Sequence, residues 1–96
     1  MPSTRKYRSA VMLIQSILEE LLKSEPDGMV KTQIYKNVRI KTTIGEKYIE
    51  QLVSAGYISV KEEKWGKERI RMRIRITPKG KQRFAWFMQL SNELEV

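Results

Sequence analysis

The chain has 96 residues, 41% of them hydrophobic, which suits one small domain with a modest core. It contains no cysteine and no histidine, so disulfides, thiolate metal sites, thiol catalysis and the commonest general base are excluded. The formal net charge is +8 and the pI is about 9.9, which predicts a polyanionic partner, either nucleic acid or an anionic membrane surface.

The positive charge is concentrated in two neighbouring segments. Residues 31–47 carry five basic residues and one acidic residue, and residues 61–75 carry seven basic and three acidic residues. Residues 19–27 are instead acidic, with four acids and one base. A single charge cluster is more often a solvated face, so the clusters gain meaning only from the elements that carry them. No apolar run approaches ~20 residues and the N-terminus lacks a signal-peptide core, so we expect no membrane segment.

The first predicted element is a helix from about Ser9 to Lys23, preceded by a polar and basic arm at residues 1–8. Apolar residues recur along this helix at spacings of three and four, as they do on one helical face. That apolar stripe comprises Ala10, Val11, Ile14, Ile17, Leu18 and Leu21. Met12 and Leu13 fall outside it, and we assign both to an interface with another chain.

Residues 25–28 read Glu-Pro-Asp-Gly, a composition that stops a helix and reverses the chain. The two apolar residues that follow, 29–30, are enough for only a stub of strand. Residues 31–58 then form the segment around which the predicted fold is organised. Within this segment we expect a short helix from Thr32, its N-cap, to about Asn37.

A second helix in this segment is predicted to open at Thr43 and to end at Gly56, after a break at residues 38–41. Thr43 and Glu46 have the spacing of a capping box. Gly45 lies on the apolar side of the helix, where we interpret it as a close helix-helix contact, because glycine costs about 1 kcal/mol of helix propensity. The pattern predicts a helix-turn-helix whose second helix would enter a DNA major groove. The alternative is an ordinary amphipathic surface helix.

Two strands are predicted after the second helix. Residues 57–62 alternate between apolar and polar types, and residues 64–68 form a turn around Gly66. Residues 69–76 alternate almost perfectly, with four arginines on one side and isoleucine or methionine on the other. We therefore predict a two-stranded hairpin with a basic outer face, which would form a wing beside the helix-turn-helix.

The last predicted element is a helix that begins with Thr77 as N-cap and Pro78 at the first position, and runs to about Glu93. Its apolar stripe comprises Phe84, Phe87, Leu90 and Leu94. Trp86 and Met88 flank that stripe, so the apolar arc is wide enough to indicate an interface. The alternative is that these side chains all belong to the core of the monomer.

These segments resemble the small archaeal winged-helix proteins, a family that includes transcription regulators, nucleoid-associated DNA binders and viral relatives. The resemblance rests on ILEELLKSE, KTQIYKNVRI, YIEQLVSAGYI and ITPKGKQRF, and it extends from about Arg8 to Leu90. It implies DNA binding as a dimer held by the C-terminal helix, often beside the first helix. Gly45 departs from the family, which usually has a larger apolar residue at that position.

We therefore expect one α+β, mostly α-helical domain over residues 1–96. A winged helix-turn-helix core of three helices and a two-stranded wing would span residues 9–76, and a C-terminal dimerisation helix residues 77–96. The predicted function is double-stranded DNA binding by a homodimeric transcriptional regulator in the cytoplasm, on the nucleoid or on host-cell DNA. No phosphate loop, metal cluster or carboxylate pair stands out, so we expect no enzyme activity, metal, cofactor, small-molecule substrate or membrane partner. The alternatives are a protein-protein interaction module and a non-specific DNA-packaging protein.

The predicted site residues fall into four groups. The base-contacting residues, on the exposed side of the second helix near its N-terminus, are Thr42, Thr43, Lys47 and Gln51. The phosphate-contacting residues are Tyr35, Lys36, Arg39 and Lys41. The wing-tip residues are Lys64, Lys67 and Arg69, whereas Arg71, Arg73 and Arg75 lie further from the tip and would add only to the electrostatic field. The dimer interface residues are Met12, Leu13, Phe84, Trp86, Phe87, Met88, Leu90 and Leu94.

Overall fold

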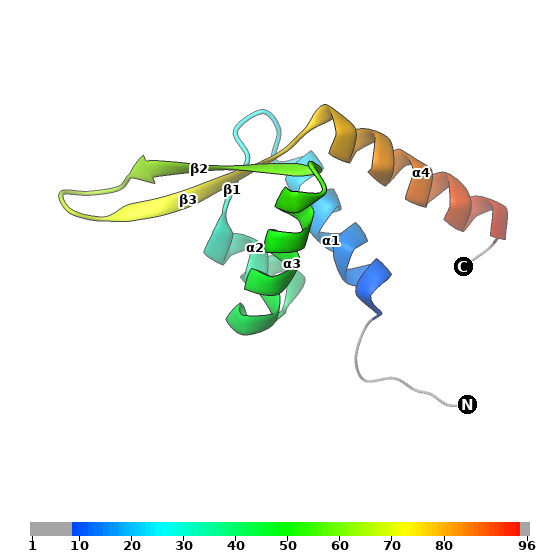
Figure 1. The fold of residues 1–96 in the computed structure, drawn as a ribbon, viewed down its shortest axis with the longest axis horizontal. Helices are drawn as coiled ribbons and strands as arrows, with labels where there is room; N and C mark the ends of the chain where they lie inside the picture. The colour runs from blue at the N-terminus through cyan, green and yellow to red at the C-terminus, as the bar shows by residue number, and fades with distance from the viewer. Residues whose placement is uncertain (1–8, 95–96) are drawn as a thin grey trace.

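The computed structural model describes residues 9–94, apart from the side chains of Ser91 and Leu94, so the basic arm at residues 1–8 lies outside it. The elements are α1 (Ala10–Lys23), β1 (Met29–Val30), α2 (Lys31–Val38), α3 (Thr42–Ser54), β2 (Ile58–Lys64), β3 (Ile70–Ile76) and α4 (Pro78–Leu94). In Figure 1, α1, α2 and α3 lie below the sheet, β2 and β3 project beyond them as a long wing, and α4 runs off in the opposite direction. This arrangement confirms the predicted winged helix-turn-helix with a C-terminal helix.

The sheet includes the predicted stub of strand at residues 29–30, β1, in addition to the two strands of the wing. Its order is β1-β3-β2, and both pairs are antiparallel. The stub at residues 29–30 pairs with β3 through Met29 opposite Ile74 and Val30 opposite Arg73. Gly28 permits this pairing because its φ is 80° and because a Cβ there would lie 2.4 Å from the Ile74 carbonyl oxygen. The chain can therefore pass close to β3 before it enters α2.

The core lies where α1, α2 and α3 pack against one face of the sheet. Its buried members are Leu13, Ile17, Leu18, Leu21, Ile34, Tyr35, Val38, Ile49, Leu52, Ile58, Ile74 and Ile76. Leu13 was assigned to an interface because it was predicted to lie outside the core. That prediction was wrong, because its side chain is only 8% exposed within this core. Val11 and Met12, by contrast, are each 51% exposed, so the buried side of α1 keeps Ile17, Leu18 and Leu21 of the predicted stripe but has Leu13 in place of Val11.

Several helix ends follow the predicted chemistry. The Ser9 hydroxyl accepts a hydrogen bond from the Met12 amide at 3.2 Å, and the Thr77 hydroxyl accepts one from the Gly80 amide at 3.0 Å. At the end of α3, Gly56 has a φ of 80° and its amide donates to the carbonyl of Val53. The next amide, of residue 57, donates to that of residue 52, which completes a Schellman motif.

Two predicted N-caps were wrong. Helix α2 begins at Lys31 with Val30 as its N-cap, and α3 begins one residue earlier than predicted with Lys41 as its N-cap. The side chains of Val30 and Lys41 accept no hydrogen bond from their helices. Thr32 lies inside α2 and is therefore not its N-cap. Thr43 lies inside α3, and Glu46 hydrogen-bonds to residues of α2 instead of closing a capping box.

Candidate nucleic-acid interface

The helix-turn-helix is formed by α2, α3 and the short turn between them. Arg39 ends α2 in the left-handed conformation, with φ 64° and ψ 54°, which reverses the chain without a glycine. The amides of Arg39 and Ile40 both donate to the carbonyl of Tyr35, at 2.8 and 3.0 Å. Lys41 then leads directly into α3. Because the turn is this short, the N-terminal end of α3 projects from the domain beside the end of α2.

A close contact between Gly45 and Tyr35 joins the two helices. A Cβ on Gly45 would lie 2.4 Å from the Tyr35 ring, so only glycine fits there without movement of the ring. This confirms the prediction that Gly45 marks a close helix-helix contact. The Tyr35 hydroxyl donates to a carboxylate oxygen of Glu46 at 2.5 Å, and the Lys31 ammonium donates to the other oxygen at 2.8 Å. We call these three residues and Gly45 the helix joint.

The helix joint changes the acid-base properties of its members. The hydrogen bond from Lys31, and then that from Tyr35, lower the pKa of Glu46, so this carboxylate is held in its charged form. Burial, followed by the hydrogen bond to Glu46, raises the pKa of the Tyr35 phenol. Tyr35 is 5% exposed and its hydroxyl is occupied, which argues against its predicted role as a phosphate contact.

The polar residues predicted to contact DNA bases are all exposed on one helix. Thr42, Thr43, Lys47 and Gln51 occupy the first ten residues of α3, while the opposite side of that helix buries Ile49 and Leu52. Lys36, Arg39 and Lys41, the other predicted phosphate contacts, are exposed at the end of α2 and in the turn. Of the eight residues predicted on α2, the turn and α3 to contact bases or phosphates, seven are therefore exposed and only Tyr35 is buried.

The wing tip carries the three predicted cations in exposed positions around a glycine turn. Lys64, Lys67 and Arg69 are all exposed, and Gly66 takes a φ of 79° at the turn. The guanidinium of Arg69 lies 5.3 Å from the centroid of the Trp65 ring, which is itself 48% exposed. Trp65 was predicted only as a turn residue; the signal that could have identified its contacts is a tryptophan between lysines and arginines, whose cations can stack on an aromatic face.

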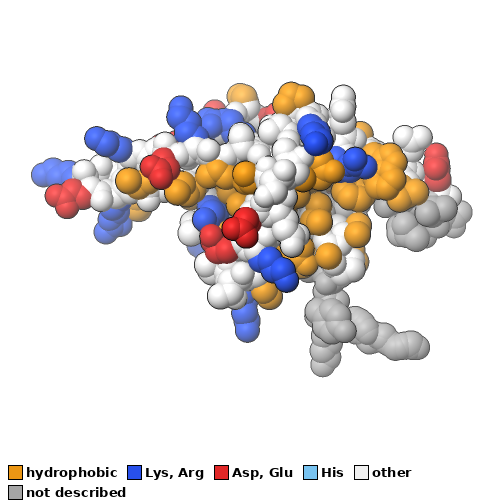
Figure 2. Space-filling view, in the orientation of Figure 1, with side chains coloured by type: hydrophobic (Ala, Val, Ile, Leu, Met, Phe, Trp, Pro, Cys, Tyr) orange, Lys and Arg blue, Asp and Glu red, His pale blue; other side chains and the backbone are white. Residues whose placement is uncertain are grey.

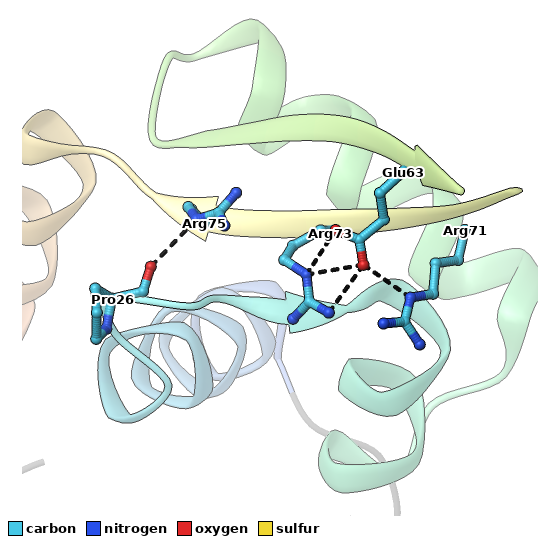
Figure 3. Close-up of polar contacts among 5 residues, drawn as sticks. All are labelled: Pro26, Glu63, Arg71, Arg73 and Arg75. Carbon is cyan, nitrogen blue, oxygen red and sulfur yellow. Dashed lines mark hydrogen bonds and ion pairs between the residues drawn. The ribbon is translucent and has the colours of Figure 1, made fainter. Parts of the chain in front are cut away.

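Behind the tip, one carboxylate organises two arginines on the outer face of the sheet. Arg71 donates from Nε to Glu63 at 2.8 Å, and Arg73 donates from Nε and Nη2 to the same carboxylate at 2.9–3.1 Å (Figure 3). These bonds, the one from Arg73 first, lower the pKa of Glu63 to about 2. Arg75 is tied separately, through Nε, to the carbonyl of Pro26 at 3.1 Å. Each of the three arginines in β3 therefore donates a hydrogen bond to another part of the protein.

The predicted dimer residues divide into exposed and packed groups. Met12, Trp86 and Met88 are 51%, 48% and 44% exposed, respectively. Phe84 and Phe87 are partly buried against the core, Leu90 is partly buried, and the side chain of Leu94 lies outside the described part of the structure. Figure 2 shows hydrophobic side chains gathered over α1 and α4 on the side away from the wing, where Lys and Arg predominate. Exposed apolar side chains therefore lie on α1 and α4, away from the cations of the wing tip.

Metal-binding and membrane-spanning features are both absent from the described residues. Residues 9–94 contain no group of three or more aspartate, glutamate, histidine or cysteine residues positioned to hold a metal ion. None of the helices within those residues combines the length and apolar character that a membrane crossing requires.

Comparison with solved structures identifies the same architecture in other proteins. A variant of MepR from a multidrug-resistant clinical isolate of S. aureus superposes with a TM-score of 0.74 at 18% identity, over 86% of this chain and 58% of that one. This chain thus spans less than two thirds of MepR. The protein smu.1704 from Streptococcus mutans UA159 gives 0.77 at 19% identity, over 96% and 87% of the two chains.

An archaeal structure has the same fold. Sso10a-2, a DNA-binding protein from Sulfolobus solfataricus, gives a TM-score of 0.62 at 23% identity, over 92% of this chain and 86% of that one. Likeness at these identities shows the fold alone. A search of curated proteins found no match. A winged helix-turn-helix family profile, however, matches residues 7–94. Because that match spans nearly the whole chain, the protein belongs to the winged helix-turn-helix family.

Proposed function

We propose that the protein binds double-stranded DNA through α3 and the wing tip, and that it acts as a dimeric transcriptional regulator. The observation that carries the proposal is that α3 exposes polar side chains on one side and is hydrogen-bonded to α2 through Glu46. Lys47 and Gln51 are exposed one turn apart, while Glu46 on the same helix is fixed to α2. A reading helix needs both features, because side chains can discriminate bases only when their backbone is held in place.

The relatives support this proposal at the level of the fold. Sso10a-2 is described as a DNA-binding protein, and a further structural match, at a TM-score of 0.59 and 11% identity, is a possible transcriptional regulator from Methanosarcina mazei Go1. In helix-turn-helix proteins the second helix lies in the major groove, with its N-terminal residues at the base edges. Helix α3 is the second helix of the motif in this chain, which supports its assignment as the reading helix.

The proposed contacts follow from side-chain chemistry. Lysine pairs best with guanine and glutamine with adenine, at roughly 1–3 kcal/mol of discrimination for a good contact. We therefore assign base contacts to Lys47 and Gln51 and, at the start of α3, to Thr42 and Thr43. Phosphate contacts are assigned to a group that carries no sequence information: Lys36, Arg39, Lys41, Lys64, Lys67 and Arg69.

The decisive measurement is a base-by-base affinity profile of the wild type and two variants. Lys47→Ala and Gln51→Ala should each relax preference at one or two positions per half-site, and Gln51→Ala should leave non-specific binding largely intact. Gln82→Ala, which removes an exposed glutamine from α4, is the matched control and should leave the profile unchanged. Profiles that keep their shape in both α3 variants would exclude α3 as the reader.

The same assay separates the alternatives. Absence of binding to random and genomic DNA at two salt concentrations would favour a protein-protein interaction module. A steep salt dependence without sequence preference would favour DNA packaging, because phosphate contacts alone determine that behaviour.

Dimerisation through α4 is the second part of the proposal. Trp86 and Met88 on α4 are about half exposed, as is Met12 on α1, and such a patch on a small domain usually marks an interface. Replacing Trp86 and Met88 by serine should give a folded monomer, because neither side chain belongs to the buried core. Sedimentation over micromolar concentrations measures the mass. A wild-type protein that stays monomeric throughout would disprove this part, and a dimer should require paired half-sites about one helical turn apart or a multiple of it.

A further inference from the structure

A groove runs beside β3, between the wing and the start of α2. It has a volume of about 850 Å³, and its lining includes Val30, Trp65 and Met72 together with four cations. Those cations are Lys31, Arg69, Arg71 and Arg73, and no aspartate or glutamate belongs to the lining. The lining of the groove therefore combines apolar, aromatic and basic side chains, and it includes none of the predicted base-contacting residues of α3.

The groove exists because β1 is short. Strand β1 pairs with β3 only at Arg73 and Ile74, whereas β3 continues to Ile70. The stretch from Ile70 to Met72 thus has β2 on one side and no partner strand among the described residues on the other. The side chain of Ile70 in this stretch is 63% exposed. An extended ligand can lie along this open edge without displacing any part of the domain.

The charge of the groove remains positive after its internal ion pairs are counted. Lys31 pairs with Glu46, and Arg71 and Arg73 share Glu63. Four cations less two carboxylates leave a net charge of +2 at the groove. Arg71 uses only Nε in its bond to Glu63, and its Nη atoms form none of the hydrogen bonds found within residues 9–94 (Figure 3). Glu63 therefore holds the guanidinium of Arg71 in place, and the two Nη atoms of Arg71 are available to an anion.

The spacing of these groups fits a chain rather than a compact molecule. Alternate residues of a strand are roughly 6.7 Å apart, so Arg69, Arg71 and Arg73 extend over about 13 Å along one side. Trp65 stands at the end of this row, where the guanidinium groups of Arg69 and Arg71 lie 5.3 and 5.6 Å from its ring centroid. Proteins that bind single strands combine a basic groove along the backbone with an aromatic side chain on which a base stacks.

We propose that this groove binds a single-stranded nucleic acid, with its phosphates along the arginines of β3 and one base stacked on Trp65. The ligand would be sequence-tolerant, because stacking and phosphate contacts do not distinguish the bases strongly. A duplex bound by α3 and a single strand bound here would use different residues, apart from Arg69 at the wing tip. The groove thus gives the protein a second nucleic-acid surface.

The test uses the intrinsic fluorescence of Trp65. The chain has two tryptophans, so Trp86→Phe leaves Trp65 as the single reporter. Titration with an oligothymidylate of about six nucleotides at low salt should quench its emission, and an oligouridylate arm shows whether deoxyribose or ribose is preferred. Either oligonucleotide supports the proposal, and the tighter one identifies the source. An unchanged Trp65 emission with both oligonucleotides would overturn it.

Two charge variants distinguish a built groove from a general field. In the Trp86→Phe protein, Arg71→Gln should weaken oligonucleotide binding about fivefold or more and reduce the slope of log K against log salt by about 0.7. Lys61→Gln removes the same charge from the same face of the sheet, but Lys61 lies on β2 outside the groove, so affinity should change little. Equal losses in both variants would overturn the proposal.

Duplex binding measured in parallel keeps this proposal distinct from the one concerning α3. Arg71→Gln should leave the base preference on a duplex unchanged, whereas Lys47→Ala should alter that preference and leave oligothymidylate binding intact. If the Trp86→Phe protein, with its groove intact, recognises the duplex normally but gives no single-strand signal, the groove proposal is refuted and the α3 proposal stands.

Discussion

Replacement of Gly45 by alanine tests the helix joint most directly, because two opposing effects act at the same position. In an open helix the change should stabilise the protein by about 1 kcal/mol, since alanine has the higher helix propensity. Here the new Cβ would lie 2.4 Å from the ring of Tyr35, which is about 1 Å inside ordinary contact. The ring is buried and its hydroxyl is bonded to Glu46, so it cannot move freely.

The magnitudes predict that the steric effect is the larger one. Overpacking of a filled site costs about 1–3 kcal/mol. Displacement of the ring also weakens its hydrogen bond to the carboxylate of Glu46, and hydrogen bonds to charged groups contribute about 1.5–3 kcal/mol. After the propensity gain is subtracted, Gly45→Ala should destabilise the domain by about 1–3 kcal/mol. A domain of this size loses roughly 4–8 °C of melting temperature for each kcal/mol.

The assay is a double-mutant cycle followed by thermal and urea unfolding. Tyr35→Ala removes the ring atoms that meet the new Cβ, so in that background Gly45→Ala should be neutral or stabilising by up to about 1 kcal/mol. The sign of the glycine substitution should therefore reverse between the two backgrounds. If Gly45→Ala stabilises the wild type, or if its effect is the same with and without Tyr35, the close contact does not govern this position.

Three further predictions concern other parts of the chain. Replacing Lys64, Lys67 and Arg69 together by alanine should reduce the slope of log K against log salt for duplex DNA by up to ~3, at about 0.9 per phosphate contact, and an unchanged slope would mean that the wing points away from DNA. Glu63→Gln should flatten the dependence of unfolding free energy on pH: the folded pKa is lowered to about 2, so the stabilisation is complete above the usual glutamate range and is lost as pH falls towards 2. Thr77→Ala should cost about 1 kcal/mol in urea unfolding, because the Gly80 amide loses its acceptor, whereas Thr77→Ser should restore stability.

The sequence predicted those features that depend on local rules. Apolar periodicity located α1 and the strands, Gly56 closed α3 in the left-handed conformation, and Thr77 capped α4. Gly45 was also interpreted correctly, because a glycine on the packed side of a helix usually marks the close approach of a neighbouring element. Each of these inferences uses residues within about one or two helical turns, where spacing alone determines which groups can meet.

The sequence could not predict contacts that depend on how distant elements are placed. Tyr35 was assigned to phosphate because it lies in a basic segment, but the crossing of α2 and α3 directs its hydroxyl to Glu46, eleven residues away. That bond also removed Glu46 from the predicted capping box. Met29 similarly pairs with Ile74 in the sheet, and no local sequence pattern indicates this pairing. Leu13 is buried because the neighbouring elements cover its side of α1, whereas Val11, which the predicted stripe included, is exposed.

One acidic residue in each basic segment has a structural role. A carboxylate near the phosphates of DNA would be repelled, and Glu46 lies on the predicted reading helix while Glu63 lies on the wing. Both accept short hydrogen bonds from neighbouring cations, Glu46 from Lys31 and Glu63 from Arg71 and Arg73. Each carboxylate thus offsets part of the local charge, and it also fixes the position of a flexible side chain. The carboxylates weaken the attraction of the two basic surfaces for anions, but they also fix the positions of the cationic side chains. Fixed side chains allow a surface to recognise the shape of a nucleic acid and not only its charge.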